Sequence, residues 1–286
     1  MRRKDKILHI LLSSSAIITF LLIAGILYTL FSKSLPIFRE TGIFNLLATS
    51  NWSVVQGAEK IGILGFVMGT IKTSLIALVI CIPFSLSIAL FCGDLYRGTK
   101  LAGWISGFFQ IMVYIPSILL GVWGYHCLRP ILIQLNIGEQ GFGIFTAGLV
   151  LALMIIPPAT TISLTFFNRI PNSLRECALS FGATRLDITR RISLPFVKKG
   201  FVYSYLFALS KVIGEVMIVV LLVGNSFNYP LNWFETGSTM TSVVLAQFGE
   251  SNDIKQSALF AILLLLFIFT AIINYLTGRI IKRELS

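Results

Sequence analysis

The sequence predicts an all-α integral membrane protein with about six transmembrane helices. Hydrophobic residues make up 56% of the 286 residues and charged residues only 12%, against about 25% charged residues in soluble domains. The apolar residues also fall in runs of about 20 to 30, the length that a helix needs to cross a hydrocarbon core of about 30 Å. A water-soluble fold could not hide this much apolar surface.

The apolar runs define the predicted spans. The first run follows a basic start and resembles a signal peptide, but it is about 25 residues long and no A-x-A cleavage site follows it, so we interpret it as an uncleaved first span. The other five runs have no such ambiguity. The six spans are residues 7–31, 62–92, 101–128, 142–167, 200–224 and 256–281.

Lysine and arginine counts predict the orientation, since positively charged loops tend to stay in the cytoplasm. With the N-terminus inside, the inner segments carry 16 of the 23 basic residues and the outer segments carry 5. The other two, Lys72 and Lys211, fall inside apolar runs. Both termini are therefore expected in the cytoplasm. The net charge of +11 mainly reflects this orientation, and a nucleic-acid partner is not needed to explain it.

Three connections between the predicted spans are long. Residues 32–61 and 225–255 are expected to face outward, and residues 168–199 inward. Loops of about 30 residues exceed what a helix connection needs, and they usually carry function or contact a partner. We therefore expect the protein to dock a partner on each face of the membrane.

The cysteines and histidines indicate no metal or disulfide chemistry. Cys81 and Cys92 lie in one apolar run, Cys127 ends another, and Cys177 lies in a basic loop, which is neither a disulfide framework nor a zinc spacing. The two histidines lie far apart in the sequence, with no carboxylate cluster beside them. We expect no metal site in this chain.

The inward loop predicts two short amphipathic helices. Ser173 and Glu176 have the spacing of a capping box and place a helix start just after Pro171. An apolar stripe at i, i+4 and i+7 then follows, formed by Leu174, Ala178 and Phe181.

A glycine elbow separates the two predicted helices of this loop. Gly182 can adopt the left-handed conformation that ends a helix. Thr184 followed by Asp187 offers a second, weaker helix start. Pro195 is expected to end that second helix.

This loop also resembles the EAA motif, which is typical of permease subunits in binding-protein-dependent ABC importers. The resemblance implies that the segment is a coupling helix, which sits in a groove of an ATPase subunit and transmits its closure to the membrane spans. One departure is Cys177, where the family usually has alanine. The matching residues are Glu176, Ala178, Gly182, Ile192, Leu194 and Pro195.

An alternative for the loop is a pair of basic helices that rests on lipid headgroups. If the coupling interpretation holds, the energy source lies on another subunit, because the chain contains no G-x-x-x-x-G-K-[S/T] phosphate loop. The resemblance therefore implies a transport subunit that is not an enzyme and carries no cofactor, with ATP used by a partner.

Further stretches resemble the PstC family of phosphate permeases, from about residue 60 to the C-terminus. They are Tyr114 to Ser117 with Gly121, Lys211 to Met217, Val223 to Asn225, and Thr239 to Thr241 with Gly249 and Glu250. The resemblance implies a type I ABC importer permease fold in a bacterial inner membrane. Residues 1–60 are then a transmembrane anchor with the first outer loop. Residues 61–286 are the importer transmembrane domain, with a cytoplasmic coupling loop at 168–199.

The same resemblance implies the partners: a second, PstA-like permease, a PstB-like ATPase dimer, a periplasmic PstS-like phosphate-binding protein, and phosphate as substrate. Sulfate or molybdate is the alternative substrate, because permeases for those anions share the EAA segment. A secondary transporter that works without an ATPase would explain the spans but not the inward motif. An intramembrane enzyme lacks support, since the chain has neither H-E-x-x-H nor G-x-S-x-G.

Two ionisable residues in the fifth predicted span are candidates for the substrate pathway. Lys211 and Glu215 lie at i and i+4, and an ionisable residue at a helix centre costs about 2.5 to 3.5 kcal/mol on insertion scales. They form either a structural ion pair inside the bundle or the lining of an anion pathway. PstC-like permeases usually have arginine in place of Lys211. Lys72 is a third candidate, near enough to the outer surface to snorkel.

Overall fold

The computed structural model describes residues 3–52, 61–250 and 253–285. The chain is helical almost throughout. The α-helices are α1 (Arg3–Thr41), α2 (Ile43–Ala48), α3 (Leu64–Leu90), α4 (Lys100–Met112), α5 (Ser117–Trp123), α6 (Arg129–Gln134), α7 (Ile144–Asn168), α8 (Asn172–Ser180), α9 (Arg185–Ile188), α10 (Leu194–Ile213), α11 (Met217–Leu222), α12 (Met240–Gln247) and α13 (Asp253–Leu285). Three π-helical turns, η1 (Phe91–Leu95), η2 (Gly124–Leu128) and η3 (Thr189–Ser193), and the 3₁₀ turn η4 (Phe248–Glu250) complete the described elements.

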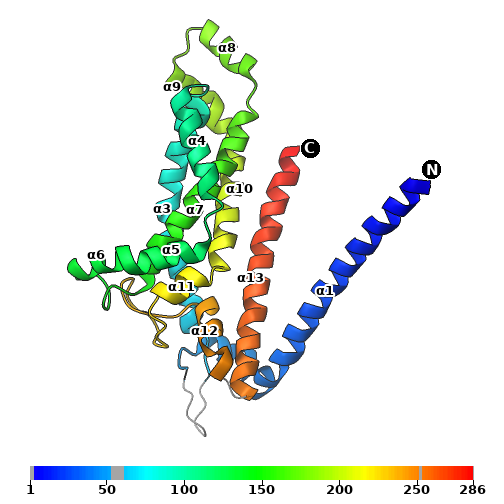
Figure 1. Cartoon of the computed structure of the whole chain (residues 1–286), viewed down its shortest axis with the longest axis vertical. Helices are drawn as coiled ribbons and strands as arrows, with labels where there is room; N and C mark the ends of the chain where they lie inside the picture. The colour runs from blue at the N-terminus through cyan, green and yellow to red at the C-terminus, as the bar shows by residue number, and fades with distance from the viewer. Residues whose placement is uncertain (1–2, 53–60, 251–252, 286) are drawn as a thin grey trace.

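The long helices form a bundle with two distinct ends (Figure 1). Helices α3, α7 and α10 pack against one another, and α13 packs beside α10. The short helices α8 and α9 project at one end, and α2 and α12 lie at the other. The described ends of α1 and α13 nearest the termini both point toward the end that carries α8.

Small residues allow the central helices to approach closely. Gly148 of α7 leaves room for Ile76 of α3, because a Cβ at this glycine would lie 2.7 Å from that side chain. Lipid tails are as apolar as leucine, so helices in a membrane associate through such close packing. The fully buried small residues of this core include Ala77, Ala147, Ala159 and Ala208.

Four predicted spans match single helices. The spans 7–31, 62–92, 142–167 and 256–281 correspond to α1, α3, α7 and α13, which are each long and apolar enough to cross a membrane. Helix α1 runs ten residues beyond its predicted end, through Pro36. The proline breaks the backbone ladder there, and the Ser257 hydroxyl bridges the gap: it donates to the carbonyl of Lys33 at 2.8 Å and accepts from the N–H of Ile37 at 3.1 Å.

The third predicted span, residues 101–128, was wrong as a continuous helix. The chain bends by 96° between α4 and the helical stretch Ser117–Gln134. Pro116 is the N-cap of α5, and a proline disfavours helical dihedrals at the residue before it. Helices α5 and α6 consequently run across the bundle (Figure 1), and the pair counts as one broken span or a re-entrant loop.

The fifth predicted span, residues 200–224, also consists of two helices. Helix α10 ends at Ile213 with Gly214 as its C-cap, and α11 starts at Met217. The prediction that Pro195 ends the helix before it was wrong as well: the chain stays helical from α9 through η3, and Pro195 occupies the first turn of α10. A proline fits there because the first N–H groups of a helix have no intrahelical partner.

Candidate coupling surface and substrate pathway

The projecting hairpin α8–α9 is built largely as the sequence predicted. Gly182 has a φ of 80°, the left-handed conformation that favours glycine. Thr184 and Asp187 form a complete capping box at the start of α9, which confirms that prediction. The hydroxyl and the backbone N–H of Thr184 both donate to the Asp187 carboxylate. These bonds lower the pKa of Asp187, and the hydroxyl has the larger effect.

The capping box predicted for Ser173 and Glu176 was wrong. Helix α8 starts at Asn172, one residue earlier, with Pro171 as its N-cap and no side-chain cap. Ser173 therefore lies inside the helix, where its hydroxyl is past the position that caps. The helix start is set by Pro171, whose fixed φ places it immediately before the first turn.

The apolar side chains of the hairpin are exposed on its surface. Phe181, at its tip, is 92% exposed, and Leu174 and Leu179 are about half exposed. Ala178 is half-buried and Glu176 is exposed. An uncovered apolar stripe on a short helix is the kind of surface that docks in a groove of a partner.

The structure separates the six predicted coupling residues into two groups. Glu176, Ala178 and Gly182 belong to the projecting hairpin. The other three lie in the unbroken helical stretch that leads into α10, where Ile192 and Leu194 are half-buried and Pro195 is exposed. Only the first group lies on the surface that a partner would meet at the tip.

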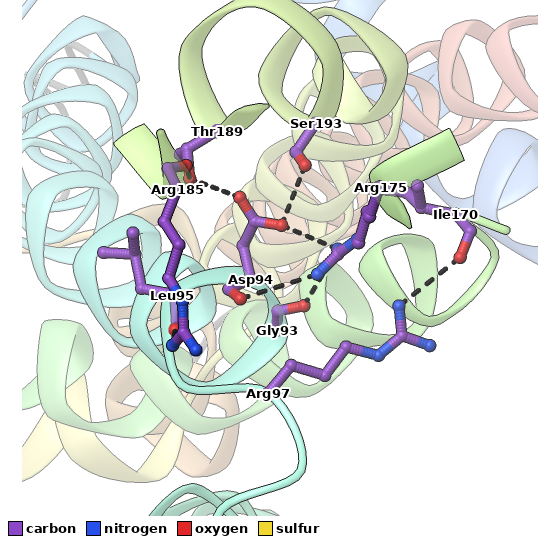
Figure 2. A network of polar contacts seen from close by, with 9 residues as sticks. All are labelled: Gly93, Asp94, Leu95, Arg97, Ile170, Arg175, Arg185, Thr189 and Ser193. Atoms are coloured by element: carbon purple, nitrogen blue, oxygen red, sulfur yellow. Dashed lines mark hydrogen bonds and ion pairs between the residues drawn. The ribbon is translucent and has the colours of Figure 1, made fainter. Parts of the chain in front are cut away.

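Asp94 is the centre of a polar network that the sequence analysis missed (Figure 2). This carboxylate lies in η1, directly after α3, and its side chain is 3% exposed. Arg175 of α8 forms an ion pair with it at 2.6 Å, with the guanidinium 13% exposed. The hydroxyls of Thr189 and Ser193 in η3 donate to its two oxygens at 2.5 and 2.8 Å. One carboxylate thus joins the end of α3 to both parts of the coupling segment.

Backbone carbonyls of the same turn extend this network. Arg175 also donates to the carbonyl of Gly93 at 3.3 Å, and Arg185 of α9 donates to the carbonyl of Leu95 at 3.2 Å. Burial is the largest influence on the Arg175 pKa and lowers it, the Asp94 charge raises it, and Arg97 lowers it further. A cavity of 390 Å³ lies between these groups, Asn172 and Ile188. The signal for Asp94 in the sequence was a lone carboxylate that ends an apolar run.

The candidate pathway residues Lys211 and Glu215 are not paired in the structure. Glu215 lies beyond the end of α10, and its carboxylate accepts the backbone N–H groups of Met217 and Ile218 at 3.1 and 3.4 Å. It thereby caps α11, where the helix dipole favours a negative charge. Of the two alternatives, the structural i, i+4 ion pair does not form in the described chain, because the helix stops between the two residues.

Lys211 is half-buried in the last turn of α10. In the part of the chain that the structure describes, its ammonium has no hydrogen-bond or ion-pair partner. Lys72 differs: it is only 9% exposed, and its ammonium donates to the carbonyls of Pro230 and Leu231 at 2.7 and 2.8 Å. Lys72 is thus covered by the connection between α11 and α12.

A bundle of apolar helices, several of them broken, with a small helical hairpin projecting from one end, is the architecture of a transporter's membrane subunit. Residues 82–285 match the family described as the inner membrane component of binding-protein-dependent transport systems. The chain belongs to this family, and it is a multi-pass membrane protein with a transport role.

Named relatives agree with this membership, and a solved structure shares the fold. The chain is 33% identical to the phosphate transport system permease protein PstC of Haemophilus influenzae, over 94% of the chain and 90% of that protein. It is 30% identical to the protein of the same name from Mesorhizobium japonicum, over 98% of the chain and 91% of that protein. An inward-facing MetNI methionine ABC transporter shares the fold, with a TM-score of 0.57, 20% identity, and coverage of 78% and 94%.

Proposed function

We propose that this chain forms the membrane pathway for inorganic phosphate in an ATP-driven importer. The observation that carries the proposal is the identity of about a third to proteins named phosphate permeases, extending over nearly the full length of both chains. The region that matches the family model, residues 82–285, includes both Lys211 and the hairpin α8–α9.

The proposal places the hairpin α8–α9 and both termini in the cytoplasm of a bacterial cell. Three features support it: the positive-inside count of 16 to 5, the location of the described terminal ends of α1 and α13 on the side of α8, and the uncovered apolar stripe with Phe181. The partners are a PstB-like ATPase dimer at the hairpin, a second PstA-like permease within the membrane, and a periplasmic PstS-like phosphate-binding protein outside. ATP is bound by the ATPase, and this chain carries no cofactor.

The pathway part of the proposal assigns Lys211 the positive charge that attracts the anion. Its ammonium is half-buried and has no partner among the described residues, whereas the ammonium of Lys72 is occupied by two carbonyls. Glu215 has the separate task of capping α11 and so holding the break between the two helices. An unpaired cation at a helix break suits an anion that must bind and leave again.

Uptake of radiolabelled phosphate by a strain that lacks this chain tests the proposal. Restoring the chain should restore uptake that excess unlabelled phosphate abolishes and that excess sulfate or molybdate leaves unchanged. Competition by sulfate or molybdate would reassign the substrate to that anion. Transport that persists when the ATPase subunit is removed would instead indicate a secondary transporter and would overturn the ATP-driven part.

A further inference from the structure

Helix α3 is held tightly at its outer end by the loop between α11 and α12, residues 223–239. The Thr70 hydroxyl accepts from the backbone N–H of Met240 at 2.9 Å. At Gly69 the carbonyl of Ser238 leaves no room for even a Cβ atom. One turn of α3 therefore contacts backbone groups at the end of this loop.

Lys72, on the same turn of α3, binds the middle of the same loop. Its ammonium donates to the carbonyls of Pro230 and Leu231 at 2.7 and 2.8 Å, and it lies 5.5 Å from the ring centre of Trp233. The side chain is 9% exposed. A buried ammonium with two charge-assisted hydrogen bonds is expensive to detach, because the carbonyls and the charge would each lose a partner.

The inner end of the same helical rod is held by Asp94. The ion pair with Arg175 and the hydroxyl bonds from Thr189 and Ser193 attach it to α8 and to η3. Lys72 and Asp94 are 22 residues apart on one continuous helical stretch, Leu64–Leu95. At 1.5 Å per residue the separation is about 33 Å, close to the hydrocarbon thickness of about 30 Å. This separation matches the distance between the two edges of the hydrocarbon core.

We propose that α3 is a strut that links the coupling hairpin to the outer loop 223–239, with Asp94 and Lys72 as the positioning residues at its ends. The inference rests on the proposed function, in which the hairpin meets an ATPase and the outer loop meets a binding protein. A displacement of the hairpin pulls on Asp94, moves α3 along α7, and reaches the middle of the outer loop through Lys72. Gly69 and Thr70, in contrast, contact the end of that loop. The competing route is α10, which continues covalently from the hairpin through η3.

The test uses the complete importer, reconstituted in vesicles with its ATPase and binding protein, and measures how strongly the phosphate-loaded binding protein stimulates ATP hydrolysis. Coupling free energies between sites usually correspond to about 5- to 150-fold effects. Asp94→Asn and Lys72→Met should each lower the stimulation at least about fivefold. The stimulation in the double variant should lie within about twofold of that in the more severe single variant. Two breaks in one serial link cost no more than one break.

The matched controls are Glu40→Gln and Lys33→Met, which remove one charge each from exposed positions on α1. Both should retain wild-type stimulation. If the fold-losses of stimulation in the two single variants multiply in the double variant, the two substitutions act independently. That result would contradict the strut proposal. Wild-type stimulation in both single variants would assign transmission to α10 alone.

Loss of folding is separated from loss of coupling by a milder variant. Thr189→Val removes one hydroxyl bond to Asp94 and leaves the ion pair in place. It should lower the stimulation, by less than Asp94→Asn does, at normal abundance and normal basal ATP hydrolysis. An effect equal to that of the control variants would count against the strut. A wild-type complex that shows no phosphate-dependent stimulation would instead contradict the proposed function.

Discussion

At the scale of single residues, Asp94, Lys72 and Glu215 all have polar partners within the described part of the chain. The Asp94 carboxylate binds a guanidinium, the Lys72 ammonium binds a backbone carbonyl, and the Glu215 carboxylate binds a backbone N–H group. Each charge is therefore satisfied inside the protein and is not exposed to the hydrocarbon. Lys211 is the exception among the residues considered for the pathway, because its ammonium has no partner in the described part of the chain. An unsatisfied cation at such a site is expected to interact with a mobile anion.

Substitutions at Lys211 test its assignment to the phosphate pathway. Lys211→Arg should retain uptake, because arginine keeps the charge and adds a planar fork for oxyanions. Lys211→Gln should reduce uptake at least about tenfold, which corresponds to about 1.4 kcal/mol, at matched membrane abundance. Glu215→Gln should retain most of the uptake, since an amide oxygen still accepts the N–H groups of α11. Near-normal uptake by Lys211→Gln would leave Lys211 with no role in the pathway.

Arg175 is predicted to determine how firmly α8 is held. Arg175→Met leaves the Asp94 carboxylate buried with two hydroxyl donors, and removing one partner of a buried pair costs about 3 kcal/mol. Amide hydrogens of α8 should then exchange about 100-fold faster, as measured by mass spectrometry on the purified protein. Arg190→Met, at an exposed position nearby, is the control and should leave the exchange unchanged. Unaltered protection in Arg175→Met would show that the ion pair with Asp94 does not hold α8.

At the scale of elements, the helix ends decide the geometry of both candidate sites. The hairpin turns at Gly182, and the pathway break falls between Ile213 and Met217. Prolines occupy two different positions at the starts of these helices. Pro116 and Pro171 stand just before a helix, whereas Pro195 lies within the first turn of α10. The local chemistry of proline is the same in each case, and the flanking structure determines its effect.

The hairpin turn is testable through Gly182. Gly182→Leu should abolish coupling, because a left-handed φ strains most side chains by about 1 to 2 kcal/mol and adds bulk at the tip. Nothing in the described chain lies within 4 Å of the Cβ position, so membrane insertion should survive. Gly182→Asn is the control for strain, since asparagine tolerates this conformation. Phosphate uptake and co-purification with the ATPase are the measurements, and normal values for Gly182→Leu would contradict the docking role.

At the scale of the whole molecule, the hairpin α8–α9 and the described terminal ends of α1 and α13 point toward the same end of the molecule, opposite the loop 223–239 (Figure 1). Helix α13 packs against α10, and α1 packs against α13. The division of the chain at residue 60 into an anchor and a transmembrane domain stays a prediction. The predicted placement of the hairpin end in the cytoplasm can be measured directly.

The free cysteines make this topology measurable by labelling. Cys81 and Cys92 are buried, while Cys127 and Cys177 are exposed. With Cys127 replaced by alanine, Asn232→Cys should react with an impermeant maleimide on intact spheroplasts. Cys177 on the coupling hairpin should react only after the membrane is permeabilised. Labelling of Cys177 from outside would invert the topology and remove the ATPase from the hairpin end.

The sequence by itself determined the membrane class, four of the spans, the glycine elbow and the capping box of α9, because these follow from apolar run length and from local backbone chemistry. The coupling role of residues 168–199, predicted from six matching family positions, stays a prediction. The tertiary structure alone decided that the third and fifth spans are broken and that Lys211 and Glu215 do not pair. It alone brought Asp94 to Arg175, 81 residues later, and Lys72 to the outer loop. Those contacts join groups far apart in the chain, and helix packing creates them.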